Sequence, residues 1–476
     1  MRVPIVVLLS QLTTPVTGFI PIQALRPSHP ATPTATSALS RNPITGTLHP
    51  EQDQQRRRRR HQSSTRRHQS LLTEDGPDVK PKKTVVPKFD EVCDTCGVTL
   101  TRFMSEIAML NPELTELTTL FGAIGTACKA ISNLVKRSQL PSSQTLGYEG
   151  CVNIQGEDQK KLDVITNELL KRALRFTGRL GVLASEEEDT PVDVIFRDPS
   201  GSGSEIVFND GDQYVAVFDP LDGSSNVDAG CPTGTIIGIY EHDEYCELDD
   251  DFDMFAEGGM SDMEARCLAN ALQPGTNLVA AAYCLYSSST FLTLTLGNGV
   301  YMFTLDEQIG EFVLSKPDVR IPESSNIMSF NEANRKKWDA PLRQTLDKWA
   351  DGEGRSGSAF SSRYIGAMVG DVHRTLLYGG VFGYPGDTKN PNGKLRLLYE
   401  GAPMSFIMEQ AGGISTTGRK RVMEIKPKNV HERVPIIMGS KHDVQEIVDA
   451  YEDWDAKNDE QEMNGEKEQE EKEEEL

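Results

Sequence analysis

The first fifty residues contain no aspartate or glutamate, and no apolar run in the chain is long enough to span a bilayer. The apolar run Val3–Leu9, which follows Arg2, has only the length of a signal-peptide core. A membrane-spanning protein is therefore excluded, and we expect no membrane partner.

The N-terminal region has the composition of a targeting leader. Thr17 and Gly18 precede Phe19, and a stretch rich in Ser, Thr, Pro and Arg follows, as in transit peptides. We predict that residues 1–88 are a targeting leader and disordered linker, and that the leader is bipartite, with a signal core followed by a transit stretch that directs the chain to the plastid stroma. Simple secretion, a cytoplasmic location and an untargeted disordered tail are the alternatives.

Cysteine is sparse, with eight residues in 476. Cys93 and Cys96 form a C-x-x-C pair, but zinc would need two further ligands and no second pair of this kind exists. The pair also lacks the strand and helix that flank a thioredoxin-type motif. These two thiols are left without an assigned role.

Charge is unevenly distributed. Residues 1–88 hold 14 Lys and Arg against 5 Asp and Glu, whereas residues 452–476 hold 3 against 13, and the whole chain carries −22. The segment between them is therefore strongly acidic, which disfavours nucleic acid and favours cationic ligands. The arginine run 56–60 lacks interleaved aromatic residues, so we expect no nucleic-acid partner.

The most informative stretch is Phe218–Asn226, which follows the apolar run Tyr214–Val217. That run predicts a buried strand, and Pro220 is expected to end it. Asp219, Asp222 and the Leu221 carbonyl then form an all-oxygen set suited to a hard divalent cation. The alternative is a solvated turn, because Asp, Gly, Ser and Asn are also turn residues.

Two further acidic segments lie near expected element ends. Glu157 and Asp158 precede a predicted helix, where the helix dipole alone would favour them. Asp163 lies between apolar residues and needs a partner if buried. The acids 186–189 follow the apolar run 180–184, so their strand end and that of Asp219 could meet in one cleft.

The segment 361–413 combines cations, glycines and a carboxylate. Lys394 and Arg396 alternate with leucines, which places both cations on one face of a strand beside Glu400. This arrangement suits an anionic substrate next to a metal, although an exposed basic strand face is the alternative. His373 lies in an apolar helical context, which predicts a core residue.

With these motifs assembled, the chain resembles fructose-1,6-bisphosphatases of the plastid type from about Thr99 to Tyr451. Phe218–Asn226 and Gly393–Glu400 match the family's motifs letter for letter, and Arg363–Tyr378 matches closely. The resemblance implies an α/β fold, a layered α-β-α-β-α sandwich with two subdomains. It also implies a homotetramer that hydrolyses fructose 1,6-bisphosphate with two or three Mg²⁺ per subunit.

The resemblance also implies roles for individual residues. Asp163 and Glu187 would polarise the attacking water, and Arg396 would stabilise developing charge. The implied magnesium ligands are Glu157, Glu186, Glu187, Asp219, Leu221, Asp222 and Glu400. The implied substrate-binding residues are Asp222, Gly223, Ser224, Ser225, Asn331, Arg363, Tyr364, Met368, Tyr384 and Lys394. Arg363 would reach into a neighbouring subunit.

An acidic flap at 241–267 corresponds to the family's regulatory insertion. Glu241–Glu264 contains eleven acids and no Lys or Arg, which predicts a mobile surface segment. The resemblance pairs Cys246 with Cys267 as a disulfide that thioredoxin would reduce, whereas Leu272 replaces the family's third cysteine. Two unpaired surface cysteines are the alternative.

Some positions depart from the animal enzymes of this family. Glu157 replaces an aspartate, Asn334 replaces a tyrosine at the 6-phosphate, and Gln213 replaces a lysine of the AMP site. The Asn111–Leu117 stretch does not reproduce the loop of that site either. We therefore expect weak or absent inhibition by AMP.

The expected organisation has four parts. An N-terminal subdomain (89–290) with the metal motif and a substrate-binding subdomain (291–451) lie between the leader and an acidic disordered tail (452–476). Two alternatives to the implied activity are a sedoheptulose-1,7-bisphosphatase and a non-catalytic redox-sensing scaffold.

Overall fold

Consecutive residues of the central strands face two different hydrophobic cores. In β7 (Leu278–Tyr286), Ala282 and Cys284 join one buried cluster, whereas Ala281 and Tyr283 join another. Side chains alternate between the faces of a strand, so an unbroken apolar run indicates a sheet covered on both sides. The computed structural model describes residues 97–140, 148–152, 158–188, 191–193, 213–242 and 262–474.

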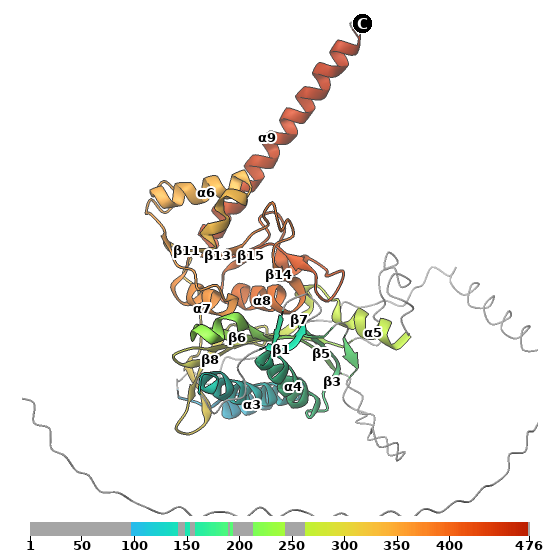
Figure 1. The fold of residues 1–476 in the computed structure, drawn as a ribbon, viewed down its shortest axis with the longest axis vertical. Coiled ribbons are helices and arrows are strands. Elements are labelled where there is room, and N and C mark those ends of the chain that lie inside the picture. Colours follow the sequence, from blue (N-terminus) through green and yellow to red (C-terminus); the bar gives the residue numbers. More distant parts are fainter. Residues whose placement is uncertain are drawn as a thin grey trace, which may run out of the picture. The chain divides into compact units, whose positions relative to one another are not determined.

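The elements stack as five layers, so the predicted α-β-α-β-α sandwich is confirmed (Figure 1). The outer helices are α2 (Leu100–Leu110), α3 (Thr115–Arg137) and α4 (Lys161–Arg175). They cover an eight-stranded sheet in the order β10 (Glu311–Lys316), β9 (Tyr301–Asp306), β8 (Thr290–Thr295), β7, β6 (Thr233–Glu241), β5 (Tyr214–Asp222), β3 (Leu180–Ser185) and β4 (Val192–Asp193).

The middle layer consists of α7 (Met368–Tyr378) and α8 (Ala402–Gln410), which lie between the two large sheets (Figure 1). The second sheet has the order β12 (Ser361–Ser362), β11 (Ile327–Phe330), β13 (Val381–Tyr384), β17 (Ile436–Gly439) and β15 (Ile414–Thr416). Helices α6 (Ala340–Asp351) and α9 (Lys441–Glu474) cover its other face. Two small pairs are β1 (Tyr148–Val152) with β2 (Asp158–Lys160), and β14 (Leu395–Arg396) with β16 (Arg433–Val434).

The strand that carries the central motif does not end at the proline. β5 continues through Pro220 to Asp222, and its register against β6 shifts between Asp219, opposite Ile236, and Asp222, opposite Gly234. This shift is a bulge with one extra residue, where the missing N–H of proline costs no ladder hydrogen bond. The expectation that the chain leaves the sheet at Pro220 is therefore wrong.

Of the other expectations about the chain's organisation, one agrees with the structure and two differ from it. Pro112 separates α2 from α3, as predicted. The eight-stranded sheet continues past the boundary expected at 290, because short hairpins join β8, β9 and β10 to β7. Residues 452–474, expected to be disordered, form the distal part of α9. Their Glu, Lys and Gln residues are good helix formers, which offsets their like charge.

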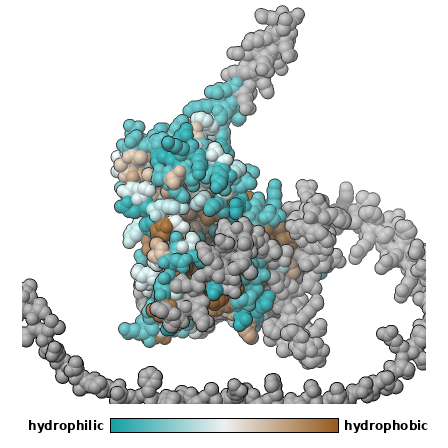
Figure 2. Space-filling view, viewed as in Figure 1, coloured by the Kyte–Doolittle hydropathy of each residue, from teal (hydrophilic) through white to brown (hydrophobic). Residues whose placement is uncertain are grey.

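The end of the acidic flap also differs from a mobile surface segment. Helix α5 (Asp262–Ala271) packs Cys267, Leu268 and Ala271 into a core with β3 and β5. Among the described residues, no helix combines the length and apolar character needed to cross a bilayer. Figure 2 shows a mostly hydrophilic surface over α6 and the first turns of α9.

Candidate active site

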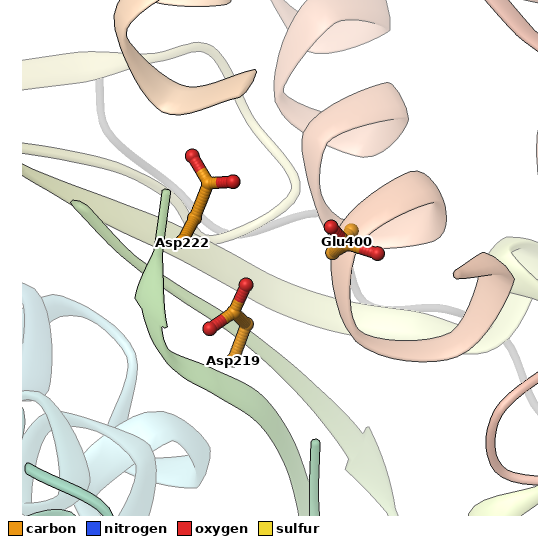
Figure 3. A group of neighbouring side chains, drawn as sticks. All are labelled: Asp219, Asp222 and Glu400. Carbon is orange, nitrogen blue, oxygen red and sulfur yellow. The ribbon is translucent and has the colours of Figure 1, made fainter. Parts of the chain in front are cut away.

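Three carboxylates from different elements meet inside the molecule. One oxygen from each of Asp219, Asp222 and Glu400 lies within 4.8 Å of the others, and all three side chains are buried. Asp219 and Asp222 come from the end of β5, and Glu400 comes from the π-helical turn η5 (Leu397–Gly401) that leads into α8 (Figure 3). The acids predicted as metal ligands on β5 and before α8 are therefore brought together.

The bulge in β5 explains why two acids three positions apart can point to one side. In a regular strand, residues i and i+3 face opposite sides, whereas one extra residue restores a common face. The Leu221 N–H donates to Asp219 Oδ1 at 2.9 Å, and the Val369 N–H donates to Asp222 Oδ2 at 2.9 Å. Glu400 Oε2 accepts from the Arg396 N–H. Each carboxylate is thus fixed by a backbone donor.

Burial makes this cluster electrostatically unfavourable without a cation. It raises the pKa of Asp222 to about 7 and that of Glu400 to about 8, and neighbouring acids, Glu186 among them, add to both shifts. The pKa of Asp219 is raised well above its usual value by burial and by Glu186. Convergent buried oxygens that resist ionisation fit a hard divalent cation, which would restore their ionised forms.

Arg396 is a buried cation at the edge of the cluster. Its Nη2 lies 3.1 Å from Glu186 Oε1, and its Nη1 lies 3.9 Å from Glu400 Oε2. Burial opposes its charge, but Glu400 and Glu186 raise its pKa above the usual value. Its Nε makes no hydrogen bond within the described residues, so this donor stays available for an anion.

The turn after β3 lies beside β5, as its acids predicted. β3 and β5 are parallel, with Ser185 opposite Phe218, and the Glu186 N–H donates to the Phe218 carbonyl at 3.1 Å. Glu186 and Glu187 are both partly buried. The parallel pairing is what places this turn beside Asp219.

Asp163 lies in the first turn of α4 and is buried, as its apolar flanks predicted. Its Oδ2 accepts from the Lys160 N–H at 3.1 Å, whereas its Oδ1 has no hydrogen-bond partner in the described part of the chain. Burial raises its pKa to about 6, against the lowering effect of the Lys160 N–H hydrogen bond.

Gly223 makes the turn that follows the two aspartates. Its φ of +72° is in the left-handed region, and a Cβ there would lie 2.7 Å from the Ala367 Cβ. Ser224 and Ser225 begin the short helix η2 (Ser224–Ala229), with Ser225 exposed and Ser224 partly so.

The other predicted substrate-binding residues lie between Asp222 and Glu400 in the sequence. Met368 starts α7 and is buried, whereas Arg363 and Tyr364 precede it on an exposed loop. Burial raises the pKa of Tyr364 to about 12, with the Tyr384 hydroxyl and Asp371 adding to the shift. Asn331 caps the short helix η4 (Glu332–Lys337) by accepting from the Ala333 N–H at 3.3 Å.

The two cations of the 394–396 stretch differ in their surroundings. Lys394 is exposed, whereas Arg396 is buried in β14, which has only two residues. Cys267 is buried on α5, and its predicted partner Cys246 lies outside the described residues. Glu157, Cys93 and Cys96 also lie outside them.

His373, predicted as core, is buried and contacts the Tyr283 hydroxyl through Nδ1 at 2.9 Å.

Two residues near the site were not singled out by sequence reasoning. Lys160 Nζ contacts Asp228 Oδ2 at 2.7 Å and the Ser224 carbonyl at 3.1 Å. His431 joins the Tyr399 hydroxyl, at 2.8 Å, to the Glu188 carbonyl, at 3.0 Å. The position of Lys160, just before Asp163, could have drawn attention to it. No local pattern predicts the contact of His431, because Glu188 is far from it in the sequence.

Comparisons with known proteins identify the family of the chain. Residues 98–317 match the family model described as fructose-1-6-bisphosphatase, N-terminal domain, and residues 321–452 match the one for the C-terminal domain. Chloroplastic fructose-1,6-bisphosphatase 1 of Arabidopsis thaliana is 51% identical over 349 residues, 73% of this chain and 79% of that protein. The chloroplastic enzyme of Spinacia oleracea is 50% identical over 349 residues, 73% of this chain and 80% of that protein.

A solved structure with the same fold is the fructose-1,6-bisphosphatase of Leishmania major in its holo form. It has 38% identity and a TM-score of 0.63, and the match covers 75% of this chain and all of that one. Both halves of the chain thus match one family of hydrolases. The chain belongs to the fructose-1,6-bisphosphatase family.

Proposed function

We propose that this protein hydrolyses fructose 1,6-bisphosphate to fructose 6-phosphate and phosphate with the help of Mg²⁺. The observation that carries the proposal is the buried set Asp219, Asp222 and Glu400 beside the buried Arg396. Carboxylates that need a cation and a guanidinium that needs an anion, placed side by side, suit a metal-assisted reaction at a phosphate group.

Different residues of the chain have different proposed roles in metal binding and in activation of the attacking water. The residues that would hold two or three Mg²⁺ are Glu157, Glu186, Glu187, Asp219, Asp222, Glu400 and the Leu221 carbonyl. When bound, such ions polarise phosphoryl oxygens and lower the pKa of bound water. Asp163, with a pKa of about 6 and an unpartnered Oδ1, would accept a proton from the attacking water, assisted by Glu187.

Other residues would hold and orient the substrate. Gly223, Ser224 and Ser225 would donate hydrogen bonds to the 1-phosphate, and Arg396 would stabilise the charge that develops on it. The residues that would bind the 6-phosphate are Asn331, Arg363, Tyr364 and Tyr384. Met368 and Lys394 would contact the sugar. Arg363 would serve a neighbouring subunit of a homotetramer, which analytical ultracentrifugation can test.

Phosphate release with varied magnesium tests the activity. We expect hydrolysis of fructose 1,6-bisphosphate that requires Mg²⁺, and we expect Asp222→Asn to lower kcat by about a thousandfold. Asp443→Asn is the matched control, because Asp443 is also buried and hydrogen-bonded but lies on α9. Full activity of the Asp222→Asn variant would contradict the proposed role of Asp222, and a wild type that releases no phosphate would favour a non-catalytic scaffold. Faster turnover of sedoheptulose 1,7-bisphosphate would change the substrate.

We also propose that thiol reduction activates the enzyme through Cys246 and Cys267. Cys267 is buried in the core that α5 shares with β3 and β5, so a change at this cysteine would reach the strands that lead into the acid cluster. Reduction by thioredoxin should raise the activity of the wild type but not of Cys246→Ser. Equal activity before and after reduction would exclude the switch.

The relatives named chloroplastic support a plastid location for this chain. A fluorescent protein fused behind residues 1–88 should accumulate in the plastid stroma, and fluorescence in the cytoplasm or the medium would contradict this proposal.

A further inference from the structure

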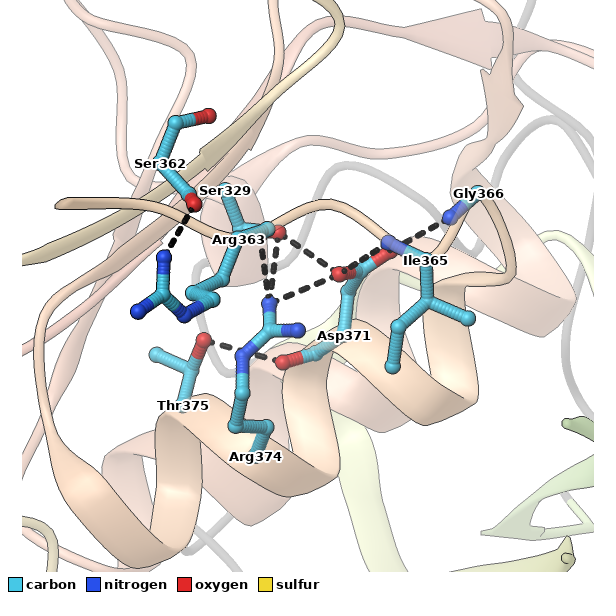
Figure 4. Close-up of polar contacts among 8 residues, drawn as sticks. All are labelled: Ser329, Ser362, Arg363, Ile365, Gly366, Asp371, Arg374 and Thr375. Atoms are coloured by element: carbon cyan, nitrogen blue, oxygen red, sulfur yellow. Dashed lines mark hydrogen bonds and ion pairs between the residues drawn. The ribbon is translucent and has the colours of Figure 1, made fainter.

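A fully buried carboxylate on α7 is not used by the proposed chemistry. Asp371 has no exposed surface, and its two oxygens accept hydrogen bonds from both side chains and backbone (Figure 4). Ser329 Oγ and Arg374 Nη2 each donate to Oδ1 at 2.7 Å. A buried charge with this many donors is well compensated, so it marks a rigid point in the structure.

The backbone donors to Asp371 come from the loop before α7. The Ile365 N–H donates to Oδ1 at 2.9 Å and to Oδ2 at 3.1 Å, and the Gly366 N–H donates to Oδ2 at 2.9 Å. Both residues follow Tyr364 directly. The carboxylate therefore fixes the chain on the C-terminal side of Tyr364.

Arg374 fixes the chain on the other side. Its Nη2 donates to the Arg363 carbonyl at 2.7 Å and to Ser329 Oγ at 2.9 Å, while it is paired with Asp371. The Asp371–Arg374 ion pair is thus hydrogen-bonded to the backbone immediately before and immediately after Tyr364 (Figure 4). Arg363 and Tyr364 are themselves exposed, so their side chains make few contacts. The backbone hydrogen bonds therefore fix the position of these two residues.

The same helix also contacts the acid cluster. The Val369 N–H in its first turn donates to Asp222 Oδ2, and Ala367 packs against Gly223 so closely that a Cβ on the glycine would clash. Helix α7 therefore connects the loop that carries Arg363 and Tyr364 to the turn that carries Asp222.

We propose that Asp371, acting through its pair with Arg374, is a positioning residue that sets the loop 363–367 for the distal phosphate of the substrate. The proposal rests on the proposed function, because it takes Arg363 and Tyr364 as ligands of the 6-phosphate. Asp371 is not among the residues proposed to hold the substrate or the metal, and its oxygens are occupied by Ser329, Arg374 and the loop backbone. Its effect should therefore appear in the binding of ligands that carry the distal phosphate.

The test compares two ligands of one enzyme. Fructose 6-phosphate carries the distal phosphate, whereas inorganic phosphate can occupy the site at Asp222 and Arg396 alone. In Asp371→Asn, the amide has one acceptor oxygen, so its NH₂ group would face backbone N–H donors. We expect fructose 6-phosphate to bind about tenfold more weakly by calorimetry, and the inhibition constant of inorganic phosphate to change less than about twofold.

Matched variants separate positioning from general stability. Asp443→Asn removes a comparable buried carboxylate, whose oxygens accept from Ser324 Oγ at 2.6 Å and from the Ser325 N–H at 2.9 Å. It should lower the melting temperature and leave both ligand constants unchanged. Arg374→Lys keeps the charge, but its shorter side chain does not reach the position of Nη2, the atom that donates to both Asp371 and the Arg363 carbonyl. It serves if Asp371→Asn does not fold.

Arg374→Lys should weaken fructose 6-phosphate in the same direction by a smaller factor. Equal weakening of both ligands, or unchanged binding of fructose 6-phosphate, would overturn the inference. A wild-type protein that releases no phosphate from fructose 1,6-bisphosphate would instead contradict the proposed function.

Discussion

At the scale of single residues, Glu400 shows how burial can oppose stability where a ligand is expected. Its pKa of about 8 exceeds the usual 4.5, so the folded protein holds a proton that the unfolded chain releases. Such a group lowers the stability of the metal-free protein as pH rises from 4.5 through 8. The carboxylate is thus maintained at a cost to the fold.

Glu400→Gln should therefore stabilise the metal-free protein and abolish its activity. The amide oxygen can still accept from the Arg396 N–H, and no negative charge is buried. We expect the free energy of unfolding in EDTA at pH 8 to rise by about 1–3 kcal/mol, and kcat to fall by at least about a hundredfold. Denaturant unfolding at pH 6 and pH 8 measures this, and a less stable variant at pH 8 would contradict it.

His373 makes the opposite contribution to pH dependence. Burial lowers its pKa from 6.5 to about 4, and Lys316 adds to the shift. Because the unfolded chain takes up the proton first, stability is unaffected above pH 6.5 and falls as pH drops from 6.5 to 4. The loss attributable to this residue should approach about 1.4 kcal/mol per pH unit in that window.

His373→Gln should remove that part of the pH dependence. Unfolding free energies at pH 7, 6 and 5 should fall less steeply in the variant than in the wild type, although the variant is less stable at pH 7 because it packs less well against Tyr283 and Phe291. Parallel curves for the two proteins would show that His373 does not titrate as its burial implies.

At the scale of elements, the apolar runs predicted the strands and helices that carry the site, but not the detail that shapes it. Tyr214–Val217 predicted a buried strand correctly, whereas the bulge after Asp219 depends on pairing with β6 that no local signal reveals. The sequence predicts neither the helix at the flap's end nor the distal part of α9, because the high charge density of both segments favours disorder. Only the family resemblance predicted that Glu400 lies beside the acids at the end of β5, because Glu400 is far from β5 in the sequence.

The expectation of weak or absent inhibition by AMP concerns the junction between α2 and α3. There, η1 (Pro112–Leu114) begins with a proline, and Glu116 in the first turn of α3 forms an ion pair with Arg179 before β3. A carboxylate already paired with this arginine leaves fewer donors for a nucleotide phosphate. AMP at millimolar concentration should leave the rate of phosphate release nearly unchanged, and strong inhibition at micromolar AMP would refute this.

At the scale of the whole molecule, the acid cluster joins the two halves of the chain. Asp219 and Asp222 belong to the region matched by the N-terminal family model, and Glu400 to the region matched by the C-terminal one. Neither half holds the set alone. A cation bound between them would therefore stabilise their association as well as the site.

Magnesium should consequently raise the melting temperature, and more strongly at pH 8 than at pH 6. Asp222 and Glu400, with pKa values of about 7 and 8, hold protons at pH 6 that the ion must displace. At one hundred times its dissociation constant, a ligand adds about 2.7 kcal/mol, which corresponds to several degrees. Thermal scans with and without Mg²⁺ measure the shift, and Asp443→Asn should show it in full. A shift of equal size in Glu400→Gln, or a larger one at pH 6, would mean that magnesium binds elsewhere than between the two halves.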